Sequence, residues 1–146
     1  MITIRRIVCP TDFSPSAAHA ANHAAAMAKA FGAEVTLVHV LPEMNFPVRG
    51  LGMTAMFPQL LEEMRARAKE QLQQAQAAFA GIPCRTELRE GRPHEVILAV
   101  AQEVSADLIV LGTAGHTGLA HALLGSVAER VVRLATCPVL TVRGPA

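Results

Sequence analysis

Glycines, hydroxyl residues and one carboxylate follow two apolar stretches of this chain of 146 residues. Asp12 comes shortly after the first stretch, and a loop from Gly112 to Gly125-Ser126 follows the later one. Glycines allow positive φ angles and close approach, so successive N–H groups of such a loop can surround an anion. A helix that opens at Gly125-Ser126 would add a positive dipole end. A carboxylate at a strand end can accept hydrogen bonds from ribose hydroxyls, so these residues indicate the binding of a phosphate beside a sugar.

Each of these residues also has a purely structural interpretation. Ser126 and Glu129 form the S-x-x-E pattern of a capping box, in which the serine only caps its helix. Asp12 could equally be a turn residue that precedes Ser14. The glycines of the later loop could provide plain flexibility. The residues alone therefore leave phosphate binding and local structure as open alternatives.

Other chemical signatures are missing from the sequence. It contains no G-x-G-x-x-G after the first apolar stretch and no G-K-[ST], which excludes the dinucleotide fingerprint and the P-loop. No Ser/His/Asp or Cys/His arrangement has assignable catalytic roles. His19 and His23 lie four residues apart, a spacing compatible with metal binding, but no cysteine or carboxylate is close in sequence. That favours surface or packing histidines, and no metal site is predicted.

Composition limits the class of protein and of ligand. With 51% hydrophobic and 17% charged residues, the chain is typical of globular proteins, and its length predicts one domain over residues 1–146. A formal charge of +1 and the absence of Trp and Tyr argue against nucleic acid, which is usually bound by basic surfaces and aromatic rings. The three separated cysteines predict buried, reduced thiols in a cytoplasmic protein. No apolar run approaches the ~20 residues that span a membrane.

Strand-like and helix-like segments alternate along the whole chain, which predicts an α/β fold with a parallel sheet and helices on both faces. Ser14 is the expected cap of the first helix and Gly32 its expected end. Between residues 42 and 58, three prolines, two glycines and three methionines predict a loop, either a lid or an ordinary connection. The expected strands cover residues 4–10, 34–41, 84–88, 107–112 and 138–143, and the expected helices cover 16–31, 60–80, 93–104 and 126–135.

The glycine spacing resembles that of a known family. Gly112-x2-Gly115-x9-Gly125-Ser126 matches the pattern G-x2-G-x9-G-[ST] of the ATP-binding branch of the universal stress protein family. The segment 10–14 resembles that family's opening loop, Gly91-x-Pro93 its pre-helix turn, and the segments 125–132 and 137–140 its C-terminal signature. The resemblance covers nearly the whole chain.

The resemblance implies a single Rossmann-like domain with a five-stranded parallel sheet of order 3-2-1-4-5. It also implies ATP, with Mg²⁺ or Mn²⁺ held through its phosphates, and a homodimer formed through the C-terminal strand. Asp12 would face the ribose and the backbone of Val40 the adenine edge, while Ala114 departs from the basic or polar residue of many relatives. The nucleotide-binding residues implied are Pro10, Thr11, Asp12, Val40, Gly112, Gly115, His116, Thr117, Gly125, Ser126 and Val127.

Three functions stay open at this point. The first is an ATP-binding stress-response or signalling protein with at most slow ATP hydrolysis. The second is an interaction module of the same fold that does not bind ATP, and the third is a hydrolase or transferase that uses an adenine nucleotide. The intact glycine pattern favours the first over the second. The lack of a catalytic constellation, with no base or cationic charge stabiliser, argues against the third.

Overall fold

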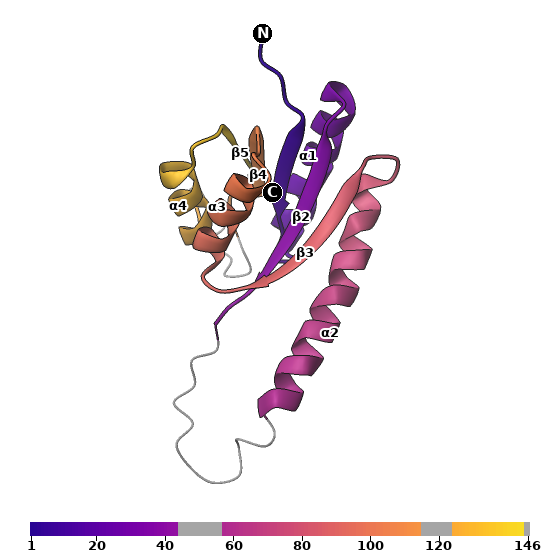
Figure 1. The fold of residues 1–146 in the computed structure, drawn as a ribbon, viewed down its shortest axis with the longest axis vertical. Coiled ribbons are helices and arrows are strands. Elements are labelled where there is room, and N and C mark those ends of the chain that lie inside the picture. Colours follow the sequence, from indigo (N-terminus) through magenta and orange to yellow (C-terminus); the bar gives the residue numbers. More distant parts are fainter. Residues whose placement is uncertain (44–56, 115–123, 145–146) are drawn as a thin grey trace.

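One sheet of five parallel strands forms the centre of the fold, in the order β3-β2-β1-β4-β5 that the resemblance implied. The computed structural model describes residues 1–43, 57–114 and 124–144. Figure 1 shows the strands side by side, with the long helix α2 beside β3. The strands are β1 (Arg6–Pro10), β2 (Glu34–Leu41), β3 (Cys84–Glu90), β4 (Leu108–Gly112) and β5 (Val139–Val142).

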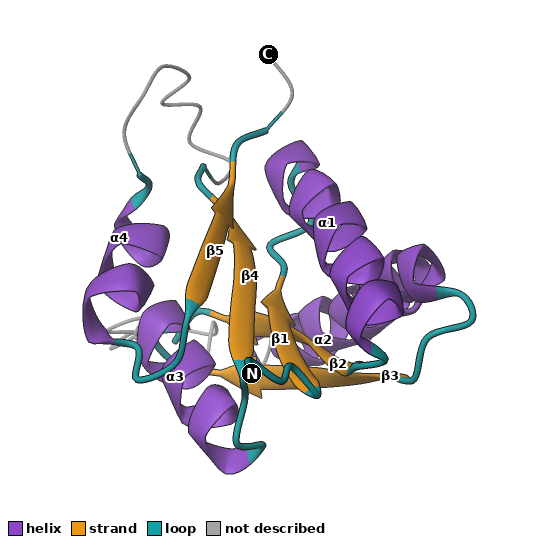
Figure 2. Cartoon of the chain, turned by 90° about the horizontal axis from the view of Figure 1, so that it is seen from above, coloured by secondary structure: helices purple, strands orange, loops and turns teal. Residues whose placement is uncertain are grey.

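Helices cover both faces of this sheet, as the alternating pattern predicts (Figure 2). Every expected element is present, with ends that differ by a few residues. The expected helix 60–80 begins earlier and ends in a separate 3₁₀ turn, η1 (Gln76–Phe79). Residues 44–56, which make up most of the loop predicted to be either a lid or an ordinary connection, lie outside the described part of the chain. The α-helices are α1 (Pro15–Phe31), α2 (Phe57–Ala75), α3 (Pro93–Glu103) and α4 (Ser126–Leu134).

Side-chain alternation along the strands separates two apolar cores. In β1, Ile7 and Cys9 point to the core beneath α1 and α2, whereas Val8 points to the core beneath α3 and α4. Because β1 and β4 pair with Ile7 opposite Leu108 and Val8 opposite Ile109, neighbouring strands point equivalent residues to the same face. Buried on both faces, the central strands have the continuous apolar sequence of parallel sheets.

Alanines let α1 lie close to the sheet. Its buried stripe consists of small residues, and the side chain of Ser14 caps its start by accepting a hydrogen bond from the N–H of Ala17 at 3.1 Å. Gly32 ends it in the left-handed conformation with φ 67°, which glycine adopts without steric cost. Both cap predictions are confirmed.

The cysteines are free, and only Cys9 is fully buried. Burial raises the pKa of the Cys9 thiol to about 12, which makes it unreactive. Cys84 and Cys137 are half-buried, so the expectation that all three would be buried holds for Cys9 alone. None of the helices in the described ranges has the length and apolar character needed to cross a membrane.

Asp107 joins the amino ends of the two central strands. Its Oδ2 accepts hydrogen bonds from the backbone N–H groups of Arg5, at 2.8 Å, and Arg6, at 3.0 Å. These two hydrogen bonds lower the pKa of the carboxyl group, because they favour its charged form. Asp107 therefore ties the start of β4 to the start of β1.

We expect Asp107→Asn to lower the free energy of unfolding at neutral pH by about 1 kcal/mol, because the amide loses the charge that strengthens both hydrogen bonds. The pKa of Asp107 is lower in the folded than in the unfolded chain. Its contribution is therefore complete above the ordinary value of 3.8 and is lost as the pH falls toward the folded-state pKa.

Urea unfolding followed by far-UV circular dichroism measures this at neutral and acid pH. Glu62→Gln, which changes an exposed carboxylate on α2, is the matched control and should leave stability unchanged. A difference between wild type and Asp107→Asn that is the same at both pH values would contradict the assignment.

Candidate functional site

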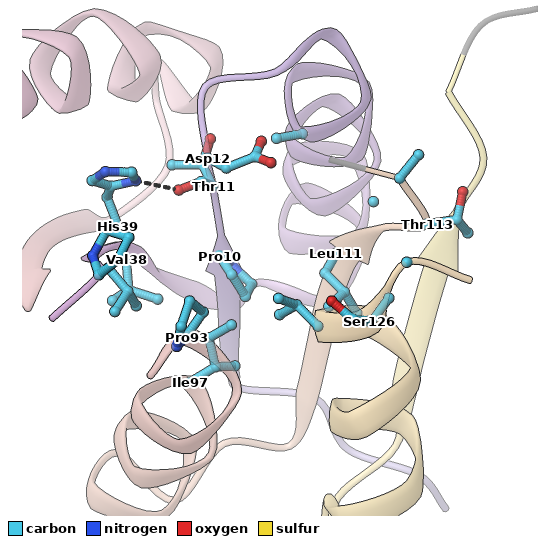
Figure 3. Close-up of a pocket in the computed structure, with 18 residues that line it drawn as sticks. Pro10, Thr11, Asp12, Val38, His39, Pro93, Ile97, Leu111, Thr113 and Ser126 are labelled. Carbon is cyan, nitrogen blue, oxygen red and sulfur yellow. Dashed lines mark hydrogen bonds between the residues drawn. The ribbon is translucent and has the colours of Figure 1, made fainter. Parts of the chain in front are cut away.

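A cleft of about 440 Å³ opens at the carboxyl ends of the strands. It lies where the winding reverses, because β1 leads into α1 on one face of the sheet and β4 leads toward α4 on the other. This is the position at which open α/β sheets bind ligands, and the volume is within the range of small-molecule pockets. Figure 3 shows its lining from the loop after β1, the end of β2, the start of α3, the end of β4 and the start of α4.

Most residues that the sequence singled out meet in this cleft. Gly115, His116 and Thr117 lie outside the described residues, so their part in the site stays a prediction. The predicted residues that line the cleft are Pro10, Thr11, Asp12, Val40, Gly112, Gly125, Ser126 and Val127.

Much of the apolar lining was missed by sequence reasoning. Val38 and Ile97 are buried, and with Pro93 and Leu111 they give the cleft apolar walls against which a flat ring could pack. Val38 could have been found from strand alternation, because it shares a face with Val40. Ile97 could have been found one helical turn after Pro93. The lining residues that were not predicted to bind the nucleotide are Ala17, Val38, His39, Pro42, Pro93, Ile97, Leu111, Thr113, Ala114 and Ala128.

The loop after β1 is a tight turn built on its own side chains. Thr11 Oγ1 accepts from the N–H of Phe13 at 3.1 Å, and Asp12 Oδ1 accepts from the N–H of Ser14 at 2.9 Å. Phe13 has a positive φ of 64°, which is rare for a residue of its size. The turn role considered for Asp12 is therefore confirmed, and the same turn leaves Asp12 in the cleft wall.

His39 holds this loop from the side of α1. Its Nδ1 lies 2.7 Å from the backbone oxygen of Thr11, and because a carbonyl oxygen only accepts, Nδ1 carries the proton (Figure 3). The imidazole also packs on the ring of Phe13, with ring centres 4.3 Å apart. His39 was not predicted, although a histidine within an apolar strand was the available signal. It fixes the backbone that positions Thr11 and Asp12.

The start of α4 provides polar N–H groups. Gly125 is the N-cap residue and Ser126 the first helical residue, with no side-chain cap hydrogen bond. The capping-box interpretation of Ser126 is therefore wrong, since the helix begins one residue earlier than that pattern requires. The first N–H groups of a helix have no partner inside it and carry its positive dipole end. The N–H of Gly125 donates to the backbone oxygen of Thr113 at 2.6 Å, which joins the end of β4 to this helix start.

Gly112 has a packing role that the sequence did not reveal. A Cβ atom at this position would lie 2.5 Å from Oγ and 3.0 Å from the backbone oxygen of Ser16. The absence of a side chain therefore lets the end of β4 approach the first turn of α1. Ser16 is buried there, and its Oγ has no hydrogen-bond partner within the described ranges.

We expect Gly112→Ala to lower the free energy of unfolding by about 1–3 kcal/mol, because the new methyl group would overpack against backbone that cannot move alone. Gly144→Ala is the matched control. Its Cβ would meet the same Ser16 at 3.4 Å, an ordinary contact, and should change stability by less than about 0.5 kcal/mol. Equal stability of the two variants in denaturant titrations would refute this role for Gly112.

Similarity to known proteins extends over nearly the whole chain. Residues 3–143 match the family model described as "Universal stress protein family". Universal stress protein MJ0531 of Methanocaldococcus jannaschii is 41% identical over 144 residues, which cover 97% of this chain and 83% of that protein. The solved structure of MJ0577 superimposes with a TM-score of 0.86 at 29% identity and covers 99% of both chains.

Two further similar structures are complexes with adenine nucleotides. One is a universal stress protein in complex with cAMP, with a TM-score of 0.69, 28% identity, and coverage of 97% of this chain and 98% of that one. The other is the universal stress protein from Archaeoglobus fulgidus in complex with dAMP. It has a TM-score of 0.67, 27% identity and the same coverages.

Proposed function

Because the chain belongs to the universal stress protein family, we propose that its cleft binds an adenine nucleotide, with ATP as the ligand. The observation that carries this proposal is the meeting of Asp12, Gly112 and Gly125-Ser126 at the point where the winding of the sheet reverses. The complexes of similar proteins with cAMP and dAMP support an adenine nucleotide as the ligand class.

In this proposal each part of the nucleotide meets a chemically matched part of the cleft. The base packs against the apolar walls near Val38 and the backbone of Val40, and the ribose hydroxyls meet Asp12. The phosphates lie at the N-terminus of α4 and in the glycine loop. None of the lining residues in the described part of the chain is Lys or Arg. Mg²⁺ or Mn²⁺ held through the phosphates would supply the positive charge that these side chains do not.

We further propose that the nucleotide regulates or stabilises the protein and that hydrolysis is slow at most. Slow phosphoryl transfer is expected where the described lining offers no Lys or Arg to stabilise the charge of the transition state. The protein would then act in the cytoplasm as a nucleotide-dependent module for a protein partner. Multiple turnovers at ordinary enzymatic rates would favour the hydrolase or transferase alternative instead.

Isothermal titration calorimetry with ATP, ADP and AMP in Mg²⁺ tests the nucleotide site. We expect Gly125→Val to weaken ATP binding by at least about tenfold, because the branched side chain would occupy the approach to the helix N-terminus. The fold should survive, since φ −60° and ψ 161° at Gly125 are allowed for valine.

Ala99→Val places the same side chain on the exposed face of α3 and is the control that should bind ATP normally. Absence of nucleotide binding by the wild type would make the proposed function wrong. Unchanged affinity in Gly125→Val would reject the assigned phosphate position.

We also propose a homodimer that pairs β5 with its copy in a second chain. The two edges of the sheet differ: β3 carries Arg85, Glu87 and Arg89, whereas Val139–Val142 has no charged residue. Charged edge strands resist pairing with another strand. The backbone oxygens of Pro138 and Val142 accept hydrogen bonds from the N–H groups of Ile109 and Thr113, on the side of β4. The alternate residues Val139 and Thr141 therefore direct their backbone groups away from β4.

Light scattering at micromolar protein should give the mass of a dimer. Thr141→Pro should reduce that mass to one chain, because it removes an outward N–H group while leaving the β4 pairing in place. Circular dichroism checks that the fold is retained. A monomeric wild type would contradict the dimer, and a Thr141→Pro protein that remains dimeric would move the interface elsewhere.

A further inference from the structure

Two histidines lie on the side of α1 that faces away from the sheet. The buried stripe of this helix consists of Ser16 and alanines, and His19 and His23 are on the other side, half-buried and exposed respectively. Residues four apart on a helix are neighbours in space. The sequence alone favoured surface or packing histidines, because no third ligand is near them. The arrangement of the rings supports a different conclusion.

The two imidazoles are already as close as ligands of one ion. Their ring centres are 4.8 Å apart, and the ring planes meet at 70°. Two imidazoles that bind one ion at about 2.0–2.1 Å, with an angle of about 90–110° at the metal, have ring centres roughly 4.5–5.2 Å apart. The observed separation lies in that interval, so a shared ion requires reorientation of the rings but no movement of the helix.

One nitrogen of His23 is available for a metal. Its Nδ1 lies 3.1 Å from the backbone oxygen of His19. Because that oxygen only accepts hydrogen bonds, Nδ1 carries a proton, and in the neutral imidazole Nε2 is then the nitrogen with the lone pair. Histidines that bind metals commonly donate their other ring N–H to a backbone carbonyl in this way, which fixes the tautomer and the ring orientation.

From this geometry we propose that His19 and His23 form a site for one divalent transition-metal ion of the Ni²⁺, Cu²⁺ or Zn²⁺ class. Two neutral imidazoles select these borderline ions over Mg²⁺ and Ca²⁺, which require oxygen ligands. Water would complete the coordination, since the described residues contain no group of three His, Cys, Asp or Glu placed to hold a metal. The one charged residue within α1 is Lys29, six positions beyond His23. The site is independent of the nucleotide cleft and of its phosphate-held ion.

Calorimetry with Ni²⁺ on the full chain tests the proposal, because imidazole is a suitable ligand for Ni²⁺. We expect one equivalent to bind to the wild type and to raise its thermal unfolding midpoint, since the ion binds the folded helix in preference to the unfolded chain. His23→Ala should weaken binding at least about tenfold, because a single remaining imidazole loses the gain from a second linked ligand.

The sharpest control keeps the number of histidines constant. His19→Ala combined with Ala18→His changes the spacing of the two histidines from four residues to five, so the two rings no longer lie on the same side of the helix. Ala18 is exposed, and alanine at position 19 favours helix, so this variant should fold normally and lose the site. His94→Ala, which removes a histidine from α3, should bind Ni²⁺ like the wild type.

Each outcome decides the proposal. Loss of affinity and of the metal-dependent rise in unfolding temperature in the spacing variant, with both retained in His94→Ala, would support the site. Equal Ni²⁺ affinity of the wild type and the spacing variant would show that the ion binds elsewhere and would overturn the proposal. No binding by the wild type at micromolar to sub-millimolar Ni²⁺ would overturn it as well. Neither result would bear on nucleotide binding.

Discussion

The pairing of β1 with β4 is the constraint on which the rest of the structure depends. These two strands are neighbours in the sheet but far apart in the chain, and the segments that follow them lead to opposite faces. A crevice must open above them, because no helix can cover the point from which two helices diverge. Asp107 holds their amino ends together through the backbone of Arg5 and Arg6. The glycine at position 112 lets the carboxyl end of β4 lie against α1.

The walls of that crevice are stiff at one end and rich in N–H groups at the other. The loop after β1 includes a strained Phe13, and a positive φ in such a residue persists only where its surroundings hold it in place. His39 holds it through Thr11 and through contact with the phenyl ring. Across the cleft, α4 begins at Gly125 without a side-chain cap. A site built from backbone and one carboxylate needs neither a basic surface nor an aromatic ring, which fits a chain of nearly neutral charge without Trp or Tyr.

The helix α1 connects the two proposed sites, the nucleotide cleft and the histidine pair, which differ in the ligands that they suit. Its first turn borders the cleft through Ala17, and its outer side carries the two histidines. The cleft suits phosphates and an ion held by oxygen, whereas paired imidazoles suit a softer ion. The same helix can therefore serve both, because Ser16 and alanines form its buried stripe while the two histidines lie on its other side.

The α/β alternation and the caps at Ser14 and Gly32 could be predicted from the sequence, and the family resemblance added the strand order and eight of the residues that line the cleft. The alternation and the caps follow from local rules, since apolar periodicity and capping residues act within a few positions, whereas the strand order and the cleft residues came from the family resemblance. Tertiary structure decided what depends on contacts between distant segments. It made Asp107 a tie between strands, gave Gly112 its contact with Ser16, and set His39 against Phe13. It also brought Ile97 into the cleft and made Gly125, not Ser126, the N-cap residue of α4. Pairs so far apart in the chain meet only when the sheet register is known, and no single-sequence pattern records that register.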